Sequence, residues 1–257
     1  MPITIIPDQR SVENTITSIF EFLFPTSYPL TDAEKEEKTT CLQHQLMDLL
    51  EGLSENKEGV VRHFVESLDE IEEVLMKDAA FILESDPAAK ELIEVIAIYP
   101  GFYAIFCYRI AHLLAQSSVS LLPRMITEYA HRITGIDIHP LATIGSPFSI
   151  DHGTGIVIGE TAHIGDHVKL YQGVTLGALS VEKNKASHKR HPSIEDHVIL
   201  YAGCTILGGE TVVGRNSIIG GNVWLTESIL PFSVVYHKSE IVVRDKPGFQ
   251  DPVNFII

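Results

Sequence analysis

The chain carries, at residues 135–176, the stretch GIDIHPLATIGSPFSIDHGTGIVIGETAHIGDHVKLYQGVTL, which has a period of six residues. An aliphatic residue recurs at Ile138, Ile144 and Ile150 and, after a slip of two residues, at Ile158, Ile164, Leu170 and Leu176. A period of six matches neither the turn of a helix nor the simple alternation of a strand. It is typical of short strands that are joined by similar turns and stacked as a parallel β-helix.

The same repeat continues over residues 194–225. Aliphatic residues recur at Ile194, Leu200 and Ile206 and, after a slip of one residue, at Val213, Ile219 and Leu225. A strand of such a coil buries its aliphatic side chain only when other coils stack on it, so a long repeat is what a stable solenoid needs. Cys204 takes an inward position that calls for a small side chain, which indicates packing rather than a nucleophilic thiol.

Residues 1–134 show helical periodicity instead. Ser11 is a candidate N-cap for a helix through Phe22, and Thr31 with Glu34 makes a capping-box pattern before a helix that ends near Gly52. Further helices are expected over residues 60–75, 87–96, 102–115 and 121–133. The fold class is therefore α+β, with an N-terminal all-helical domain that covers the open end of a C-terminal parallel β-helix.

We expect the β-helix to occupy residues 135–233, with an inserted loop at 178–193 and a C-terminal tail over 234–257. The loop contains Lys183, Lys185, Lys189 and Arg190 in an otherwise acidic chain. Such a loop commonly folds over a reaction cleft, where its positive charge would attract phosphate groups. A plain solvated loop is the equally open alternative for the individual lysines.

The composition excludes several classes of function. The formal net charge of −15 over 257 residues argues against nucleic-acid binding. The N-terminus lacks the basic start and apolar run of a signal peptide, and the most apolar stretch, residues 102–115, is interrupted by Arg109 and His112. Three widely spaced cysteines, Cys41, Cys107 and Cys204, do not suggest a disulfide framework. We expect a cytoplasmic protein with no membrane or nucleic-acid partner.

Four short motifs are more specific than the repeat. They are Asp137-Ile138-His139-Pro140, Asp151-His152-Gly153-Thr154-Gly155, Arg190-His191-Pro192 and, in the helical part, Asp86-Pro87-Ala88. Together with the pairing of a helical domain and a hexapeptide β-helix, these motifs closely resemble the serine O-acetyltransferases. The resemblance implies a β-helix that winds left-handed. It also implies transfer of the acetyl group of acetyl-CoA to the hydroxyl of L-serine, the first step of cysteine biosynthesis from serine.

The resemblance places the catalytic pair at His152 and Asp137. Attack of a hydroxyl on a thioester needs a base that takes the hydroxyl proton, and a neutral imidazole suits that task near neutral pH. His152 matches the family's base. Asp137 matches the carboxylate that holds the other ring nitrogen and stabilises the imidazolium as it forms. The two residues are fifteen apart, near one eighteen-residue turn of a three-sided coil, so we expect them to be adjacent across neighbouring coils.

The acceptor site implied by the resemblance matches the charges of an amino acid. Asp86 and Asp151 would meet the ammonium group of serine, while Arg190 and His191 would hold its carboxylate. A planar guanidinium pairs with a carboxylate through two parallel hydrogen bonds, so Arg suits this position.

The resemblance also implies a groove for acetyl-CoA between two β-helices of a trimer. Gly177, Ala178 and Ala202 match small positions that let the pantetheine arm approach the backbone, although tight coil turns favour Gly and Ala too. The chain has Ile218 where relatives place a lysine in a late coil, and the stretch after the last coil also differs. We therefore expect the nucleotide end of CoA to be held differently. No metal is expected.

Partners follow from the resemblance as well. It implies homotrimers, alone or as a dimer of trimers joined through the helical domains, and L-cysteine as a feedback inhibitor in the serine site. The C-terminal Ile257 resembles the residue that inserts into the active site of O-acetylserine sulfhydrylase, the next enzyme. A frayed apolar terminus is the plain alternative.

Three other functions stay open from the sequence. The first is an acetyltransferase of the same architecture that acts on another hydroxyl, such as homoserine or a sugar; a neutral sugar needs no clamp for two charges. The second is a zinc-dependent hydratase, suggested by the histidines His139, His163, His167, His188 and His197. The third is a scaffold with an inert His152, supported by the apolar C-terminus.

Overall fold

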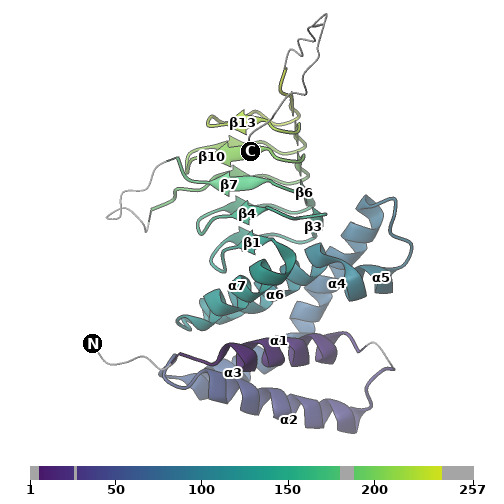
Figure 1. Ribbon diagram of the computed structural model, residues 1–257, viewed down its shortest axis with the longest axis vertical. Helices are drawn as coiled ribbons and strands as arrows, with labels where there is room; N and C mark the ends of the chain where they lie inside the picture. Colours follow the sequence, from purple (N-terminus) through teal and green to yellow (C-terminus); the bar gives the residue numbers. More distant parts are fainter. Residues whose placement is uncertain (1–5, 26–27, 180–187, 239–257) are drawn as a thin grey trace, which may run out of the picture.

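The computed structural model describes residues 6–25, 28–179 and 188–238. In these residues, seven helices precede fourteen short strands, which form a β-solenoid of five turns above the helical part (Figure 1). The predicted α+β fold class, helices first and a parallel β-solenoid after them, is confirmed. The expectations for Lys183, Lys185 and Ile257 concern residues outside the described ranges.

The helices of the N-terminal part range from 7 to 18 residues and pack mostly side by side (Figure 1). They are α1 Gln9–Leu23, α2 Asp32–Leu49, α3 Lys57–Glu66, α4 Leu68–Ser85, α5 Leu92–Ile98, α6 Pro100–Gln116 and α7 Leu122–Thr134. The capping box of α2 is present in both directions, between the side chain of Thr31 and the backbone of Glu34 and between the side chain of Glu34 and the backbone of Thr31. That sequence prediction is confirmed.

Three of the predicted helix boundaries are wrong. Asp8, not Ser11, caps α1, because its carboxylate accepts a hydrogen bond from the Ser11 N–H at 3.0 Å. The single helix predicted over 60–75 is two helices, which meet at Ser67. The helix predicted from Pro87 begins only at Leu92. The residues between α4 and α5 begin with a turn, in which the Asp86 side chain accepts a hydrogen bond from the N–H of Ala88.

The strands stack into three parallel sheets, one for each side of the coil. The first sheet has the order β1 Asp137–Ile138, β4 Val157–Ile158, β7 Thr175–Gly177, β10 Thr205–Leu207 and β13 Trp224–Leu225. The second has β2 Thr143–Ile144, β5 His163–Ile164, β8 Ser193–Ile194 and β11 Val212–Val213. The third has β3 Phe148–Asp151, β6 Val168–Tyr171, β9 Ile199–Leu200, β12 Ile218–Ile219 and β14 Val234–Val235.

The six-residue repeat predicts the inward side chains correctly. Every repeat aliphatic from Ile138 to Ile219 is buried, and only Leu225, in the last coil, is half exposed. Cys204 is fully buried, as predicted for a packing residue, and burial raises the pKa of its thiol to about 12. The predicted end of the solenoid at residue 233 is wrong. Val234 and Val235 form β14, which pairs with β12, so the coil extends past residue 233.

The helical part is joined to the first coil through α4, α6 and α7, which lie against β1 and β3 (Figure 1). The hydroxyl of Tyr108 donates to the carbonyl of Ala142 at 2.6 Å. A Cβ at Gly101 would lie 2.4 Å from the carbonyl oxygen of Ile150, so only glycine lets α6 approach β3 this closely. The first coil is thereby covered, which removes an open strand edge.

A buried ion pair crosses this junction. The Arg109 guanidinium of α6 lies 3.0 Å from the carboxylate of Asp78 in α4 and also donates to the carbonyls of Ile144 at 2.8 Å and Gly145 at 2.7 Å. Asp78 is fully buried and accepts the N–H of Phe148 at 2.8 Å. Burial raises the pKa of Asp78, and Arg109 with the hydrogen bonds opposes that rise. The pair thus ties two helices to one corner of the coil.

No single helix of the described residues combines the length and apolar character of a membrane span. Only α5 and α6 taken together pass by length and composition, with a bend of 70° between them. Ten residues of α6 are buried in the protein core.

We expect Asp78→Asn to destabilise the chain by about 3–5 kcal/mol, because it leaves the largely buried Arg109 guanidinium without its carboxylate. Urea denaturation followed by circular dichroism would measure this loss as a lower midpoint. Glu73→Gln removes an exposed carboxylate from the same helix and should change the free energy of unfolding by less than about 0.5 kcal/mol. Equal midpoints for the two variants would contradict a structural role of the pair.

Candidate active site

The predicted site residues fall into two groups on two edges of the solenoid. We call the first the His152 cluster; it contains Asp86, Tyr99, Asp151, His152 and Lys169, where the third sheet turns into the first. We call the second the Arg190 cluster; it contains His139, Glu160, Thr161, Arg190 and His191, where the first sheet turns into the second. Asp137 belongs to β1, in the first sheet between these two edges.

Asp86 is held in the turn after α4 by two neutral donors. Its carboxylate accepts the N–H of Ala88 and the hydroxyl of Tyr99, each at 2.8 Å. These two hydrogen bonds lower the pKa of Asp86, so it is a carboxylate at neutral pH. The hydrogen bond between Tyr99 and Asp86 also raises the pKa of the Tyr99 hydroxyl to about 12. Tyr99 was not found by the sequence analysis, because no motif marks a tyrosine thirteen residues from its partner.

His152 projects from the turn after β3, with 73% of its side chain exposed. Its Nε2 atom lies 3.7 Å from Oδ1 of Asp151. The backbone of His152 is left-handed, with φ of 58°, but His167 and His197 share this conformation at 57°, so it belongs to the coil corner. Gly153 is required beside it, since a Cβ there would lie 2.4 Å from Cδ1 of Ile136. The turn presents the imidazole to solvent.

Lys169 lies beneath this turn and was missed by the sequence analysis. Its ammonium is 3.1 Å from Oδ2 of Asp151, donates to the carbonyl of Ser85 at 2.8 Å and lies 4.6 Å from the centre of the Tyr171 ring. Lys169 is only 6% exposed. The repeat predicts that it points outward from β6, but the local pattern holds no sign that the end of α4 covers that position.

His191 is a neutral donor in the Arg190 cluster. Burial, together with the cations Arg190 and Lys189, lowers the pKa of His191 to about 4. Thr161 N–H donates to Nδ1 at 3.0 Å, so the proton of the neutral ring is on Nε2. The ring occupies the space beside Gly159, where a Cβ would lie 2.0 Å from Cδ2 of His191. This contact explains why glycine stands before Glu160.

Arg190 and Lys189 have structural partners in the single chain. Arg190 is ion-paired with Glu160. Burial alone would raise the pKa of Glu160, but Arg190 and two histidines hold it below its ordinary value. The ammonium of Lys189 donates to the carbonyls of Thr161 at 2.7 Å, Pro192 at 3.1 Å and His191. Its three donors are thereby used, so the structure does not support Lys189 as a phosphate ligand.

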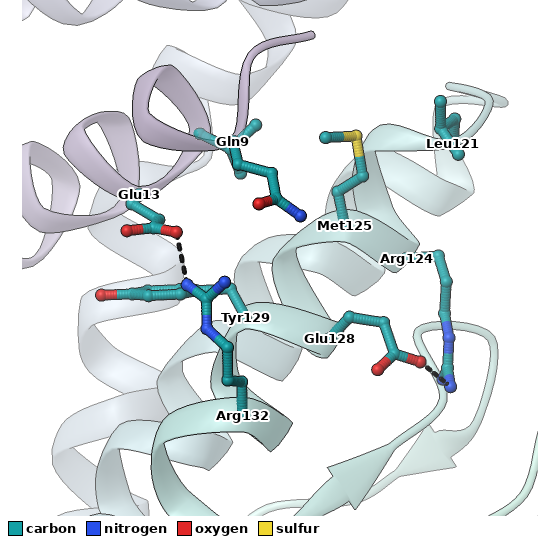
Figure 2. A pocket seen from close by; sticks show the side chains of 9 residues that line it. Gln9, Glu13, Leu121, Arg124, Met125, Glu128, Tyr129 and Arg132 are labelled. Atoms are coloured by element: carbon teal, nitrogen blue, oxygen red, sulfur yellow. Dashed lines mark hydrogen bonds and ion pairs between the residues drawn. The ribbon is translucent and has the colours of Figure 1, made fainter. Parts of the chain in front are cut away.

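Asp137 is ion-paired with Arg124 of α7, at 3.2 Å. Arg124 also pairs with Glu128, beside a cavity of about 410 Å³ between α1 and α7 that is separate from both clusters (Figure 2). His152 is paired with Asp151, and Asp137 is paired with Arg124. Among residues 6–25, 28–179 and 188–238, no ion pair joins His152 to Asp137. The register contributes to this separation, because Asp137 stacks on Val157 of the next coil.

The small residues expected beside CoA are divided between the same two edges. Ala202 directly follows Tyr201, and Tyr201 stacks in the column of Asp151 and Tyr171. Gly177 and Ala178 end and follow β7, in the column of Gly159 and Glu160. All three small residues are half exposed, which suits an approach of a ligand to the backbone. Ile218 is half buried in β12.

The histidines expected for a zinc hydratase do not converge in the part of the chain that the structure describes. His163 faces outward from the second sheet, whereas the rings of His167 and His197 stack at 4.6 Å near the third sheet. The one group there with three ligand atoms within 4.8 Å of one another is Glu128, His131 and Asp137. Arg124 is ion-paired with two of its members.

No protein-family model matches the chain. A serine acetyltransferase encoded on a plasmid of Synechococcus elongatus is 49% identical over 230 residues, which cover 86% of this chain and 71% of that protein. The serine acetyltransferase of Mycobacterium tuberculosis is 45% identical over 173 residues, covering 67% of this chain and 73% of that protein.

Solved structures agree with these relatives. Serine acetyltransferase isoform 3 of Entamoeba histolytica, crystallised in complex with cysteine, superposes with a TM-score of 0.80 at 34% identity. The match covers 90% of this chain and 84% of that one, so it includes both the helices and the solenoid. Because identity and fold agree over most of its length, the chain belongs to the serine acetyltransferase family.

Proposed function

We propose that the chain carries out the family's reaction, acetyl transfer from acetyl-CoA to L-serine, at a site completed by two copies, with His152 as the general base. The serine oxygen attacks the thioester carbonyl carbon while the imidazole takes the hydroxyl proton. A carbon–oxygen bond forms and the carbon–sulfur bond breaks. The proton then passes from the imidazolium to the CoA thiolate, giving O-acetyl-L-serine and CoA, the first step toward cysteine.

The division between two edges is the observation that supports a shared site. One edge carries His152, the acids for an ammonium group and Ala202; the other carries Arg190, His191, Gly177 and Ala178. Each edge therefore holds part of the serine site and part of the CoA site. A closed ring of three solenoids brings the first edge of each copy against the second edge of the next. The ring could stand alone or be doubled through the helical domains.

Serine supplies the charges that this arrangement can match. Asp86 and Asp151 form the acidic side, toward the ammonium group. Arg190 and the Nε2–H of His191 form the donor side, toward the carboxylate, which would replace Glu160 as a partner of Arg190. We infer that Asp137 leaves Arg124 when the copies assemble and orients His152.

L-cysteine has the same ammonium and carboxylate as serine, so we expect it to occupy the same clamp. The Entamoeba histolytica relative that was crystallised with cysteine supports this expectation. Occupation by cysteine would exclude serine without changing the base, which is the behaviour of a competitive feedback inhibitor. The cytoplasmic location expected from the sequence stays a prediction.

We expect His152→Ala to lower serine-dependent CoA release by on the order of a hundredfold or more, because the base is lost. Loss of the acetyl-CoA thioester, which the thiol of added L-cysteine does not disturb, would be followed with L-serine, homoserine and a simple sugar in parallel, and L-cysteine should raise the KM for serine only. His167→Ala is the matched control, since His167 is also exposed in a left-handed corner. Release with the sugar or homoserine but not with serine would contradict the assigned acceptor.

Mixed assemblies would test the shared site. Copies of His152→Ala and copies of Arg190→Ala are each expected to be inactive alone. Assembled together in equal amounts, they should restore about one quarter of the sites, namely those where both intact edges meet. Co-refolding followed by the thioester assay measures this recovery. No recovery in mixed trimers, verified by mass, would mean that one copy holds the whole site.

Ile257, the residue expected to bind the partner enzyme, lies outside the described ranges. We infer from membership of this family that Ile257 binds O-acetylserine sulfhydrylase. Deletion of Ile257 should abolish that binding in isothermal titration and leave acetyl transfer unchanged, because the residue would act only on the partner. Unaltered binding after the deletion would rule out this contact.

A further inference from the structure

A buried cation stands against one of the two carboxylates that face the serine ammonium. Lys169 is 6% exposed, and its ammonium lies 3.1 Å from Oδ2 of Asp151. A second partner is the carbonyl of Ser85, the last residue of α4, at 2.8 Å. This carbonyl lies at the negative end of the helix, where a cation is stabilised. Lys169 is therefore held in place by partners from two elements, and moving it would break both contacts.

The two carboxylates of the His152 cluster consequently differ. Oδ2 of Asp151 is ion-paired with Lys169, and its Oδ1 lies 3.7 Å from Nε2 of His152. Asp86 accepts hydrogen bonds only from neutral donors, the Ala88 N–H and the Tyr99 hydroxyl. Lys169 also lowers the pKa of Asp86 through its charge, but within the described residues it forms its ion pair with Asp151. A carboxylate offers about four acceptor positions, so two remain on Asp86 for an ammonium group. Two carboxylates and one ammonium leave the cluster one net negative charge.

We propose that Lys169 neutralises Asp151, so that Asp86 is the carboxylate that binds the serine ammonium, while Asp151 serves to position His152. This inference rests on the proposed function and refines the sequence expectation that both acids bind the ammonium. Lys169 thus acts as a positioning residue that sets the charge of the acceptor pocket. With Lys169 in place, a substrate with one positive charge meets one uncompensated negative charge.

The charge balance predicts an unusual pattern among three variants. Asp151→Asn leaves Lys169 unpaired beside the site and should raise the KM for serine by about tenfold or more, because the net charge becomes zero. Asp151→Asn combined with Lys169→Met restores the net charge of minus one and should return the KM to within about threefold of the native value, although the Asp151 carboxylate is gone. Asp86→Asn should raise the KM at least about thirtyfold.

The experiment measures kcat and the KM values for serine and acetyl-CoA, with calorimetric titration of L-serine as a direct readout of binding. Lys77→Met, which removes an exposed lysine of α4, is the control and should leave all of these values unchanged. The KM for acetyl-CoA should stay constant throughout, which separates the effect from general unfolding.

Two results would overturn the proposal. One is a double variant as poor in serine KM as Asp151→Asn alone, which would make Asp151 itself the ammonium ligand. The other is Asp86→Asn with a serine affinity within about threefold of native; this variant alters a half-exposed side chain and does not depend on the folding of the double variant. A native chain that binds serine in the titration but releases no CoA would instead contradict the proposed function.

Discussion

The ion pair between Asp78 and Arg109 is the contact on which the rest of the site depends. It joins α4 to α6 and, through the carbonyls of Ile144 and Gly145, joins both helices to the first coil. Asp86 follows α4 directly, and Tyr99 directly precedes α6. The pair therefore fixes the two helices whose ends carry the acid and its hydroxyl donor against β3. A solenoid alone would supply His152 and Asp151 without the acid beside them.

The solenoid has a different task, which is to repeat one geometry along two edges. Residues in successive coils stack in register. Each residue at a corner of the coil therefore has a residue at the same corner one coil later, and several of these residues are small or aromatic. In the proposed function, this stacking lets a reaction centre near the first coils be continued by positions that suit an extended cosubstrate. The corners of a three-sided coil face away from each other, so one chain presents the predicted site residues on two separate edges.

Several charges near the two edges are compensated within the chain, whereas Asp86 accepts hydrogen bonds from neutral donors. Lys169 faces Asp151, Arg190 faces Glu160, and Arg124 faces Asp137. A ligand at such a site gains by exchanging one partner for another, because leaving any of these partly buried groups unpaired is costly. In the proposed function, the carboxylate of an amino acid makes such an exchange at Arg190, while its ammonium binds Asp86. A neutral sugar can make neither interaction, which agrees with the family to which the chain belongs.

The solenoid, its inward residues, the capping box of α2 and the motifs of the predicted site can all be read from the sequence, because a six-residue period and a cap are local patterns. The capping of α1 by Asp8 and the extension of the coil by β14 could be read only from the folded chain, since short competing signals lie close together there. The folded chain also pairs Lys169 with Ser85 and Asp151 and separates the predicted site residues onto two edges. Lys169 and Ser85 are 84 residues apart, and no local pattern specifies a contact that arises when a helix end packs on a distant strand.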